Sequence, residues 1–104
     1  PFVFGDNFAR FGKAGQAAEM RDEPNAVGIP TKAYPGNDEK HFLSDSRYDE
    51  WLEGVAVDVL KLLLYKGTVV WPMNGIGTGR AELRERAPRI YKAIKRIEHL
   101  LEAN

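Results

Sequence analysis

The sequence contains no cysteine and only two histidines, His41 and His99, which lie far apart. The absence of cysteine excludes disulfides, thiolate nucleophiles and thiolate metal ligands. Two isolated histidines give little basis for a histidine metal centre. The sequence therefore predicts neither a metal site nor a bound cofactor.

Long hydrophobic runs are also missing. No apolar stretch approaches the roughly 18 residues of a membrane span, and nothing resembles a signal peptide. We therefore expect a cytoplasmic protein with no membrane partner.

An excess of charge of one sign is absent too, because 15 basic residues balance 15 acidic residues. This balance argues against nucleic acid as the partner. The distribution is uneven, because the segment 80–96 carries seven basic residues against two acidic ones. We interpret this segment as the solvated face of a helix, with an interaction module as the alternative.

The 104 residues fit a single domain spanning 1–104. Short apolar runs predict strands at 1–4, 26–29 and 68–71, the second closed by Pro30. Good helix formers predict a short helix at 16–21, and a capping box predicts a long helix from Ser46 to about Gly67. A last helix should begin between Ala81 and Pro88 and end near Glu102, with a separate short turn over 82–87.

This alternation of strands and helices predicts the α/β class. We expect a small three-layer α/β/α domain with a short, mainly parallel sheet, whose strand-following loops all lie at one edge. Ligands bind at that edge in such sheets.

The segment 72–79 is the strongest candidate site. Three glycines in five residues allow left-handed backbone, so that successive N–H groups can surround an anion. A tight turn without a ligand is the alternative. The candidate residues are Asn74, Gly75, Ile76, Gly77, Thr78, Gly79 and Arg80.

The loop that follows the first strand, called the first loop below, is another candidate. Asp6 and Asn7 could hydrogen-bond a sugar or a base, or could cap their own backbone. Thr31 and Lys32 follow the second strand, where a solvated surface lysine is the alternative interpretation. The candidate residues in the first loop are Gly5, Asp6, Asn7, Gly12, Lys13, Ala14, Gly15 and Gln16.

With these loops in place, the chain resembles the macrodomain superfamily, and most closely its terminal ADP-ribose protein glycohydrolase branch. Residues 69–79, Val-Val-Trp-Pro-Met-Asn-Gly-Ile-Gly-Thr-Gly, are similar to the family's strand and phosphate loop. Residues 12–17, Gly-Lys-Ala-Gly-Gln-Ala, are similar to the loop around the diphosphate and distal ribose, and residues 29–32 to an Ile-Thr-Lys segment that carries a lysine nucleophile. The chain also resembles small bacterial and phage domains with similar glycine-rich segments.

The resemblance implies a minimal macrodomain-like fold that binds ADP-ribose or a related phosphate-bearing nucleotide. It also implies an alternative, an ADP-ribosyl hydrolase in which Lys32 attacks the anomeric carbon and Glu82 or Asp6 is the base. Ala81 stands where the glycohydrolase branch has an acidic residue, so we rank binding above hydrolysis. A further interpretation, a phage-encoded factor that sequesters a nucleotide signal, rests on analogy alone. A homodimer through an exposed sheet edge or helix is compatible with the short strands.

Overall fold

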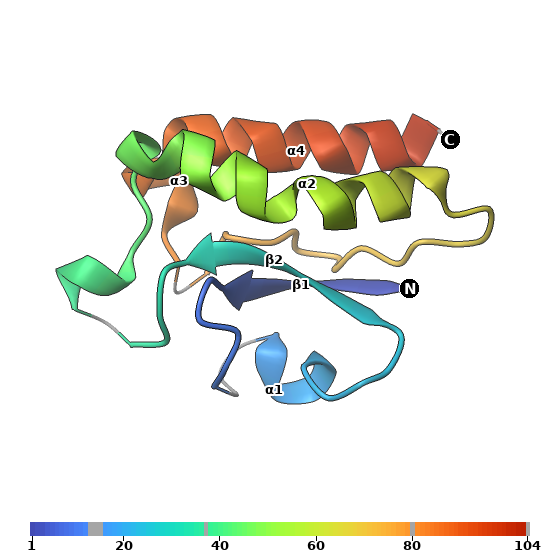
Figure 1. Ribbon diagram of the computed structural model, residues 1–104, viewed down its shortest axis with the longest axis horizontal. Helices are drawn as coiled ribbons and strands as arrows, with labels where there is room; N and C mark the ends of the chain where they lie inside the picture. Colours follow the sequence, from blue (N-terminus) through green and yellow to red (C-terminus); the bar gives the residue numbers. More distant parts are fainter. Residues whose placement is uncertain (13–15, 37, 80, 104) are drawn as a thin grey trace.

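A small parallel sheet lies at the centre of the molecule, which is described here by a computed structural model covering residues 1–12, 16–36, 38–79 and 81–103. Strands β1 (Phe2–Asn7) and β2 (Ala26–Lys32) form this sheet. Helices α2 (Tyr48–Leu64) and α4 (Pro88–Ala103) cover one face, and the one-turn helix α1 (Ala17–Met20) lies on the opposite side (Figure 1). The predicted mixed α/β class is confirmed.

Three single-turn elements complete the chain. They are two 3₁₀ turns, η1 (Glu39–His41) and η2 (Asp45–Arg47), and the short helix α3 (Leu83–Arg86). The predicted break between a short turn at 82–87 and a last helix opening with Pro88 is confirmed. Proline is well suited to this position because its missing N–H would have no partner in a first helical turn.

The predicted third strand at 68–71 is wrong as an extended element. Only Val70 pairs with β1, in a parallel bridge opposite Phe2. Val70 donates to the Pro1 carbonyl and accepts from Val3, both at 2.8 Å. The next rung would need an N–H from Pro72, which has none. The N–H of Gly5 donates instead to the Gln16 side chain at 2.7 Å, so the ladder ends after one bridge.

Strand β2 runs through Pro30 rather than ending before it, which corrects the predicted boundary at 29. Proline is tolerated because β2 is an edge strand, where a missing donor need not break the ladder. The Pro30 carbonyl accepts a hydrogen bond from the buried Trp51 indole at 2.8 Å, and this bond fixes α2 to the sheet.

Helix α2 begins at Tyr48, and the predicted capping box at Ser46 is absent. Residues 45–47 form η2, and the hydroxyls of Ser44 and Ser46 hydrogen-bond each other at 2.6 Å. Asp45 caps a different helix: its carboxylate accepts the backbone N–H groups of Arg89, at 3.0 Å, and Ile90, at 3.2 Å, in the first turn of α4. This contact stabilises the start of α4 as an N-cap does.

The apolar stripes of the two long helices form the core. Trp51, Val55 and Leu62 of α2 and Ile90, Ile94 and Ile97 of α4 are buried. They pack with Val3, Ile29, Leu43, Ile76 and Leu83 in one cluster. Within the described residues, no helix combines the length and the apolar character needed to cross a bilayer.

Candidate functional site

The predicted site residues of the two strands meet at the carboxyl edge of the sheet. Asn7 pairs with Lys32 in the parallel register, and the Thr31 hydroxyl donates to the Asp6 carbonyl at 3.2 Å. Asp6, Asn7 and Thr31 are buried, and Lys32 is partly buried. The strands thus bring these four residues together, as the topology predicted.

Gln16 joins the two glycine-rich segments. Its side-chain oxygen accepts the N–H of Gly5 at 2.7 Å, and its nitrogen donates to the carbonyl of Gly75 at 2.8 Å. The end of the first loop therefore lies beside Gly75 of the loop 72–79. Both polar groups of Gln16, a predicted ligand-binding residue, are used within the protein.

The loop 72–79 has a left-handed backbone at two of its three glycines, with φ of +78° at Gly75 and +76° at Gly77. Gly75 donates to the Pro72 carbonyl at 2.9 Å, and the Thr78 hydroxyl donates to the Asn74 carbonyl at 3.1 Å. These bonds close the loop on itself.

The four backbone N–H groups that follow Gly75 differ from that of Gly75 because they lack an acceptor. Among the described residues, no acceptor is found for the N–H groups of Ile76, Gly77, Thr78 and Gly79. A run of consecutive N–H groups with left-handed glycines is the backbone arrangement that can bind an anion. The following α3 has only four residues, so a helix dipole contributes little at this loop.

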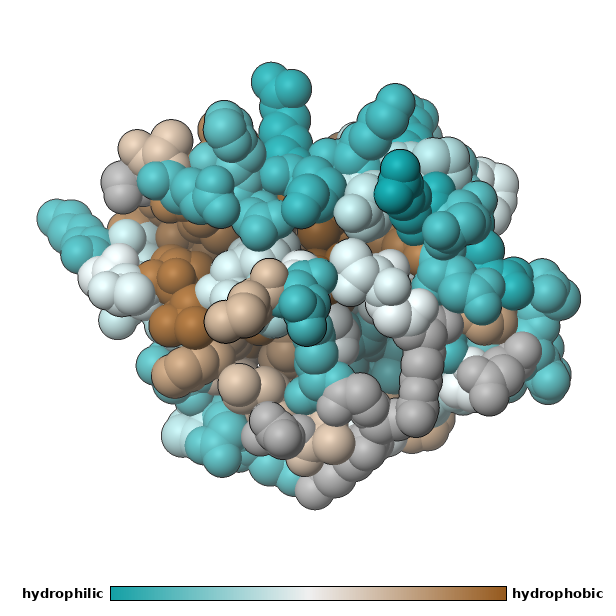
Figure 2. Space-filling view, turned by 180° about the vertical axis from the view of Figure 1, so that it is seen from behind, coloured by the Kyte–Doolittle hydropathy of each residue, from teal (hydrophilic) through white to brown (hydrophobic). Residues whose placement is uncertain are grey.

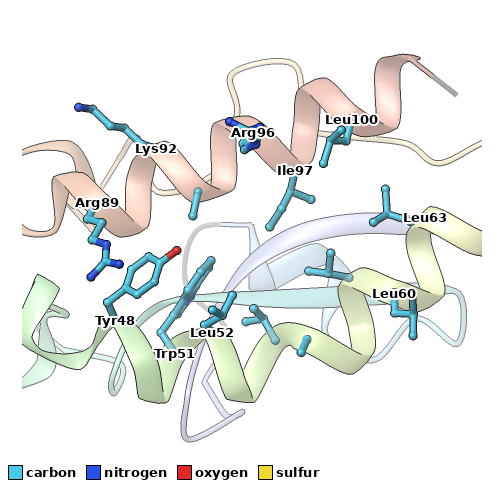
Figure 3. A pocket seen from close by; sticks show the side chains of 14 residues that line it. Tyr48, Trp51, Leu52, Leu60, Leu63, Arg89, Lys92, Arg96, Ile97 and Leu100 are labelled. Atoms are coloured by element: carbon cyan, nitrogen blue, oxygen red, sulfur yellow. The ribbon is translucent and has the colours of Figure 1, made fainter.

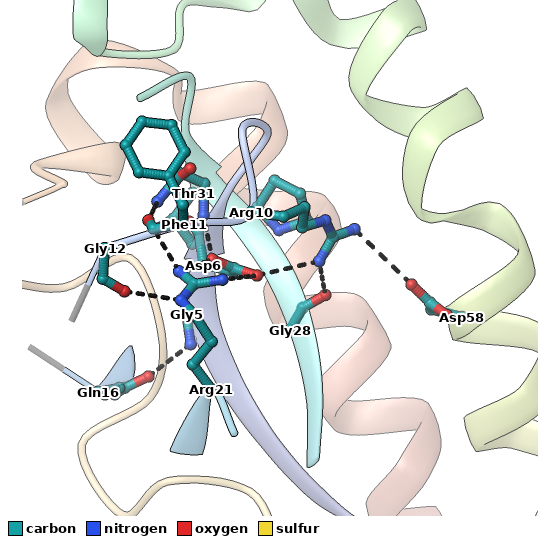
Figure 4. A network of polar contacts seen from close by, with 12 residues as sticks. Gly5, Asp6, Arg10, Phe11, Gly12, Gln16, Arg21, Gly28, Thr31 and Asp58 are labelled. Atoms are coloured by element: carbon teal, nitrogen blue, oxygen red, sulfur yellow. Dashed lines mark hydrogen bonds and ion pairs between the residues drawn. The ribbon is translucent and has the colours of Figure 1, made fainter. Parts of the chain in front are cut away.

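Asp6 lies in a network of arginines (Figure 4). Its carboxylate side chain is 3% exposed and pairs with Arg21 at 2.5 Å and with Arg10 at 3.2 Å. It also accepts the N–H of Asn7 at 2.8 Å. A Cβ at position 28 would lie 2.5 Å from the carboxylate, so only glycine at position 28 leaves room for it.

These contacts give Asp6 a structural role, whereas the sequence interpretation offered it as a catalytic base. The two arginines were not singled out from the sequence. A signal for them existed, because an acidic residue predicted at the end of a buried strand requires a cationic partner. Arg21 extends the network to the first loop by donating to the carbonyls of Gly12 at 2.6 Å and Phe11 at 3.1 Å.

Asn7 has one satisfied and one unsatisfied polar group. Its side-chain nitrogen donates to the Phe11 carbonyl at 2.9 Å, whereas its buried Oδ1 has no hydrogen-bond partner in the described part of the chain. A buried acceptor without a donor costs roughly 1–3 kcal/mol. This atom lies at the strand end where a sugar was predicted.

The other two predicted catalytic residues have partners of their own. The Lys32 ammonium donates to the Gly36 carbonyl and lies 4.7 Å from the centre of the Phe42 ring. Glu82, at φ +47°, precedes α3 and forms an ion pair with Arg86 at 3.0 Å.

Arg86 also pairs with Glu39 of η1 at 2.7 Å. The hydrogen bond from this guanidinium, followed by its charge, lowers the pKa of Glu39 below the ordinary glutamate value.

Four predicted ligand-binding residues, Lys13, Ala14, Gly15 and Arg80, lie outside the described residues. Within the rest of the chain, no group of three or more histidine, aspartate or glutamate side chains is arranged to hold a metal ion.

A small cleft of about 170 Å³ lies beside Gln16. It is mostly apolar and is lined by Phe2, Val3, Phe4, Gln16, Met20, Val70 and Pro72. Phe2 and Val70 are 41% and 42% exposed. Figure 2 shows hydrophobic side chains gathered at the end of the molecule that carries the N-terminus. The cleft therefore offers a hydrophobic surface next to a polar loop.

Comparison with known proteins identifies a family for the sequence but assigns no activity. The model of a family of unknown function, DUF7831, matches residues 1–97. No curated protein and no solved structure matches the chain significantly.

Proposed function

The chain belongs to the DUF7831 family, and we propose that it binds an ADP-ribose-like nucleotide where the loop 72–79 meets the first loop. The observation that carries the proposal is the run of four backbone N–H groups, from Ile76 to Gly79, without an acceptor among the described residues. They lie beside the first loop because Gln16 bonds to Gly75. The macrodomain resemblance of both segments supports the same ligand class.

The diphosphate is the part of the ligand that these amides suit. Hydrogen bonds from backbone N–H groups to a charged oxygen are roughly twice as strong as those between neutral groups. A side chain at Gly77 is strongly disfavoured, because its φ is +76° and a Cβ there would lie 2.8 Å from Cδ2 and 3.0 Å from Cβ of Leu83. The left-handed backbone and the contact with Leu83 hold the loop in one shape before the ligand arrives, which reduces the entropy lost on binding.

The neighbouring groups suit the rest of a nucleotide. The open acceptor of Asn7 would receive a ribose hydroxyl, which would satisfy a buried oxygen. The apolar cleft beside Gln16 would hold a base against Phe4 and Met20. We assign the phosphates to the loop and the less polar end of the ligand to this cleft.

Calorimetry with ADP-ribose, inorganic pyrophosphate and adenosine tests the proposal. We expect heat with the two phosphate compounds and tighter binding for ADP-ribose. At 100 times its dissociation constant, the ligand should stabilise the fold by about 2.7 kcal/mol. The absence of both heat and thermal stabilisation with ADP-ribose and pyrophosphate would refute nucleotide binding.

A matched pair of variants at Gly79 locates the site. A Cβ at this position meets no described residue within 4 Å, so a longer side chain fits without displacing this part of the fold. Gly79→Glu places a negative charge beside the proposed phosphates, and Gly79→Gln adds a neutral side chain of similar size. Loss of pyrophosphate binding in the first variant and retention in the second is the expected result. Equal affinity in both variants would place the anion elsewhere.

Hydrolysis of ADP-ribosyl groups is the second candidate, and the position of Lys32 beside Asn7 favours it. The hydrogen bond to Gly36 and the contact with Phe42 both involve the ammonium, and the cation–ring contact needs its charge, whereas a nucleophile must be neutral. A hydrolase would have to release Lys32 from these contacts. Release of ADP-ribose from a modified protein, lost in Lys32→Ala while ADP-ribose binding persists, is the result this function requires.

A further inference from the structure

A groove runs between α2 and α4, the two long helices that cover one face of the sheet. Its volume is about 600 Å³, and its lining includes the buried residues Trp51, Val55 and Ile97. Figure 3 shows Trp51 and Ile97 between the two helices. Leu52, Leu60 and Leu100 border it and are 45%, 56% and 45% exposed. A contiguous apolar surface of this kind on a small domain marks an interaction site.

Charges of opposite sign flank the groove: basic residues of α4 line it, and acidic residues of α2 lie just outside its lining. The α4 side presents Arg89, Lys92 and Arg96, all exposed. On α2, Asp49 and Glu53 are exposed, and they lie one turn of helix before Leu52 and Ala56. Within the described residues, neither Lys92 nor Arg96 pairs with a carboxylate, and neither Asp49 nor Glu53 pairs with a cation.

We propose that a second copy of this chain occupies the groove, forming a two-fold symmetric dimer through α2 and α4. The two helices run in the same direction, because Tyr48 and Arg89 lie at one end of the groove and Leu63 and Leu100 at the other (Figure 3). A two-fold axis along the groove places α4 of one copy on α2 of the other with matching ends aligned. Lys92 then faces Glu53 of the second copy, twice in the dimer.

The charges favour a second copy over other occupants. An acidic helix or an anionic lipid would complement Arg89, Lys92 and Arg96, but would meet like charge at Asp49 and Glu53. A second copy supplies an acidic row to the basic side and a basic row to the acidic side. Its apolar rim would also cover Leu52, Leu60 and Leu100. This surface is self-complementary, as a two-fold interface requires.

Sedimentation equilibrium over a concentration series tests the dimer. Glu53→Lys and Lys92→Glu each create two like-charge contacts, and we expect each variant to weaken dimerisation at least tenfold. An equimolar mixture of the two variants should recover it, because both contacts then pair opposite charges. Lys61→Glu, an exposed charge reversal on α2 outside the groove, is the control and should dimerise as the unmodified chain does.

The outcomes separate the occupants. An unmodified chain that stays monomeric at the highest concentrations overturns the proposal and leaves the groove to a different partner. Dimerisation unchanged in both single variants, or not recovered in the mixture, overturns this interface even if a dimer forms. Ala56→Glu places a charge in the groove wall and should weaken dimerisation in the unmodified background and in the mixture alike. Circular dichroism of each variant verifies that the fold is retained.

Discussion

The side chain of Gln16 donates to the carbonyl of Gly75 at 2.8 Å, although the two residues are 59 positions apart. The same side chain accepts the N–H of Gly5, for which the interrupted third strand supplies no backbone acceptor. The side-chain amide of Gln16 therefore connects β1, the first loop and the loop 72–79. The proposed nucleotide site depends on this contact for its shape.

Replacing Gln16 tests this dependence. Gln16→Leu leaves the Gly5 donor and the Gly75 acceptor without partners, and we expect a loss of about 2 kcal/mol in the free energy of unfolding. ADP-ribose binding should weaken as well, because the two loops are no longer joined. Gln16→Glu can still accept from Gly5 and should lose less stability. Chemical denaturation and calorimetry measure the two effects, and stability unchanged in Gln16→Leu would contradict the assignment.

Two glycines of the loop 72–79 separate the effect of backbone strain on stability from the effect of adding a methyl group. Gly77→Ala puts a Cβ on a left-handed residue and against Leu83, so we expect about 2 kcal/mol of destabilisation and loss of pyrophosphate binding. Gly79→Ala adds the same methyl group where it would lie within 4 Å of none of the described residues, and it should change the stability by less than about 0.5 kcal/mol. Thermal melts of the two variants give the comparison, and similar melting temperatures would show that the loop is not held in this conformation.

The buried carboxylate of Asp6 predicts a large effect at Arg21. Arg21→Met removes one of its two cationic partners and should cost roughly 3 kcal/mol in the free energy of unfolding. Arg10→Met, at a partner that is 40% exposed, should cost less. In the double variant Asp6→Asn/Arg21→Met, part of the loss should return, because the uncompensated charge is gone. Strictly additive losses would show that the pair is not coupled.

The cap on α4 predicts a second, smaller stability effect. Asp45→Ala removes the carboxylate that accepts the N–H groups of Arg89 and Ile90, and we expect a loss of about 1 kcal/mol. Asp45→Asn keeps an acceptor and should lose less. Ser46→Ala, at the position of the predicted capping box, should be close to neutral. A larger loss for Ser46→Ala than for Asp45→Ala would reverse this assignment.

Glu39 predicts a pH dependence of known sign. The pKa of Glu39 is lowered in the folded protein by Arg86, so its ion pair stabilises the fold above the ordinary glutamate pKa. This contribution is lost as the pH falls through the lowered value, and it is small because Glu39 is exposed. In Arg86→Met the pKa of Glu39 should rise toward its ordinary value, whereas in Glu82→Gln it should stay low. An NMR titration of the Glu39 carboxyl distinguishes these outcomes.

The two long helices were predicted close to their observed bounds, and burial of one face explains why they form. The stripes of α2 and α4 repeat at helical spacing, and Pro88 marks the start of α4. The predicted third strand failed for a tertiary reason. The β-branched run Thr68-Val69-Val70 forms one bridge to β1, but continuing the ladder requires a donor that Pro72 lacks.

The sequence predicted which residues meet at the carboxyl edge of the sheet but not the contacts that they make there. Strand ends and glycines located the sheet edge, since parallel strands share it. The partners of Asp6 and Gln16 depend on how α1 packs beside β1, which no local pattern encodes. The capping interpretation at Ser46 failed because residues 45–47 form a 3₁₀ turn, so that α2 begins only at Tyr48.

The proline within β2 has a consequence for how the protein behaves at high concentration. Beside the missing N–H of Pro30, the carbonyl of Gly28 accepts from Arg10 at 2.7 Å and that of Pro30 accepts from Trp51. An incoming strand would find these groups either absent or already in use. The outer edge of β2 is thereby protected from fibrous self-assembly, so crowding should drive association through helices rather than through sheet extension.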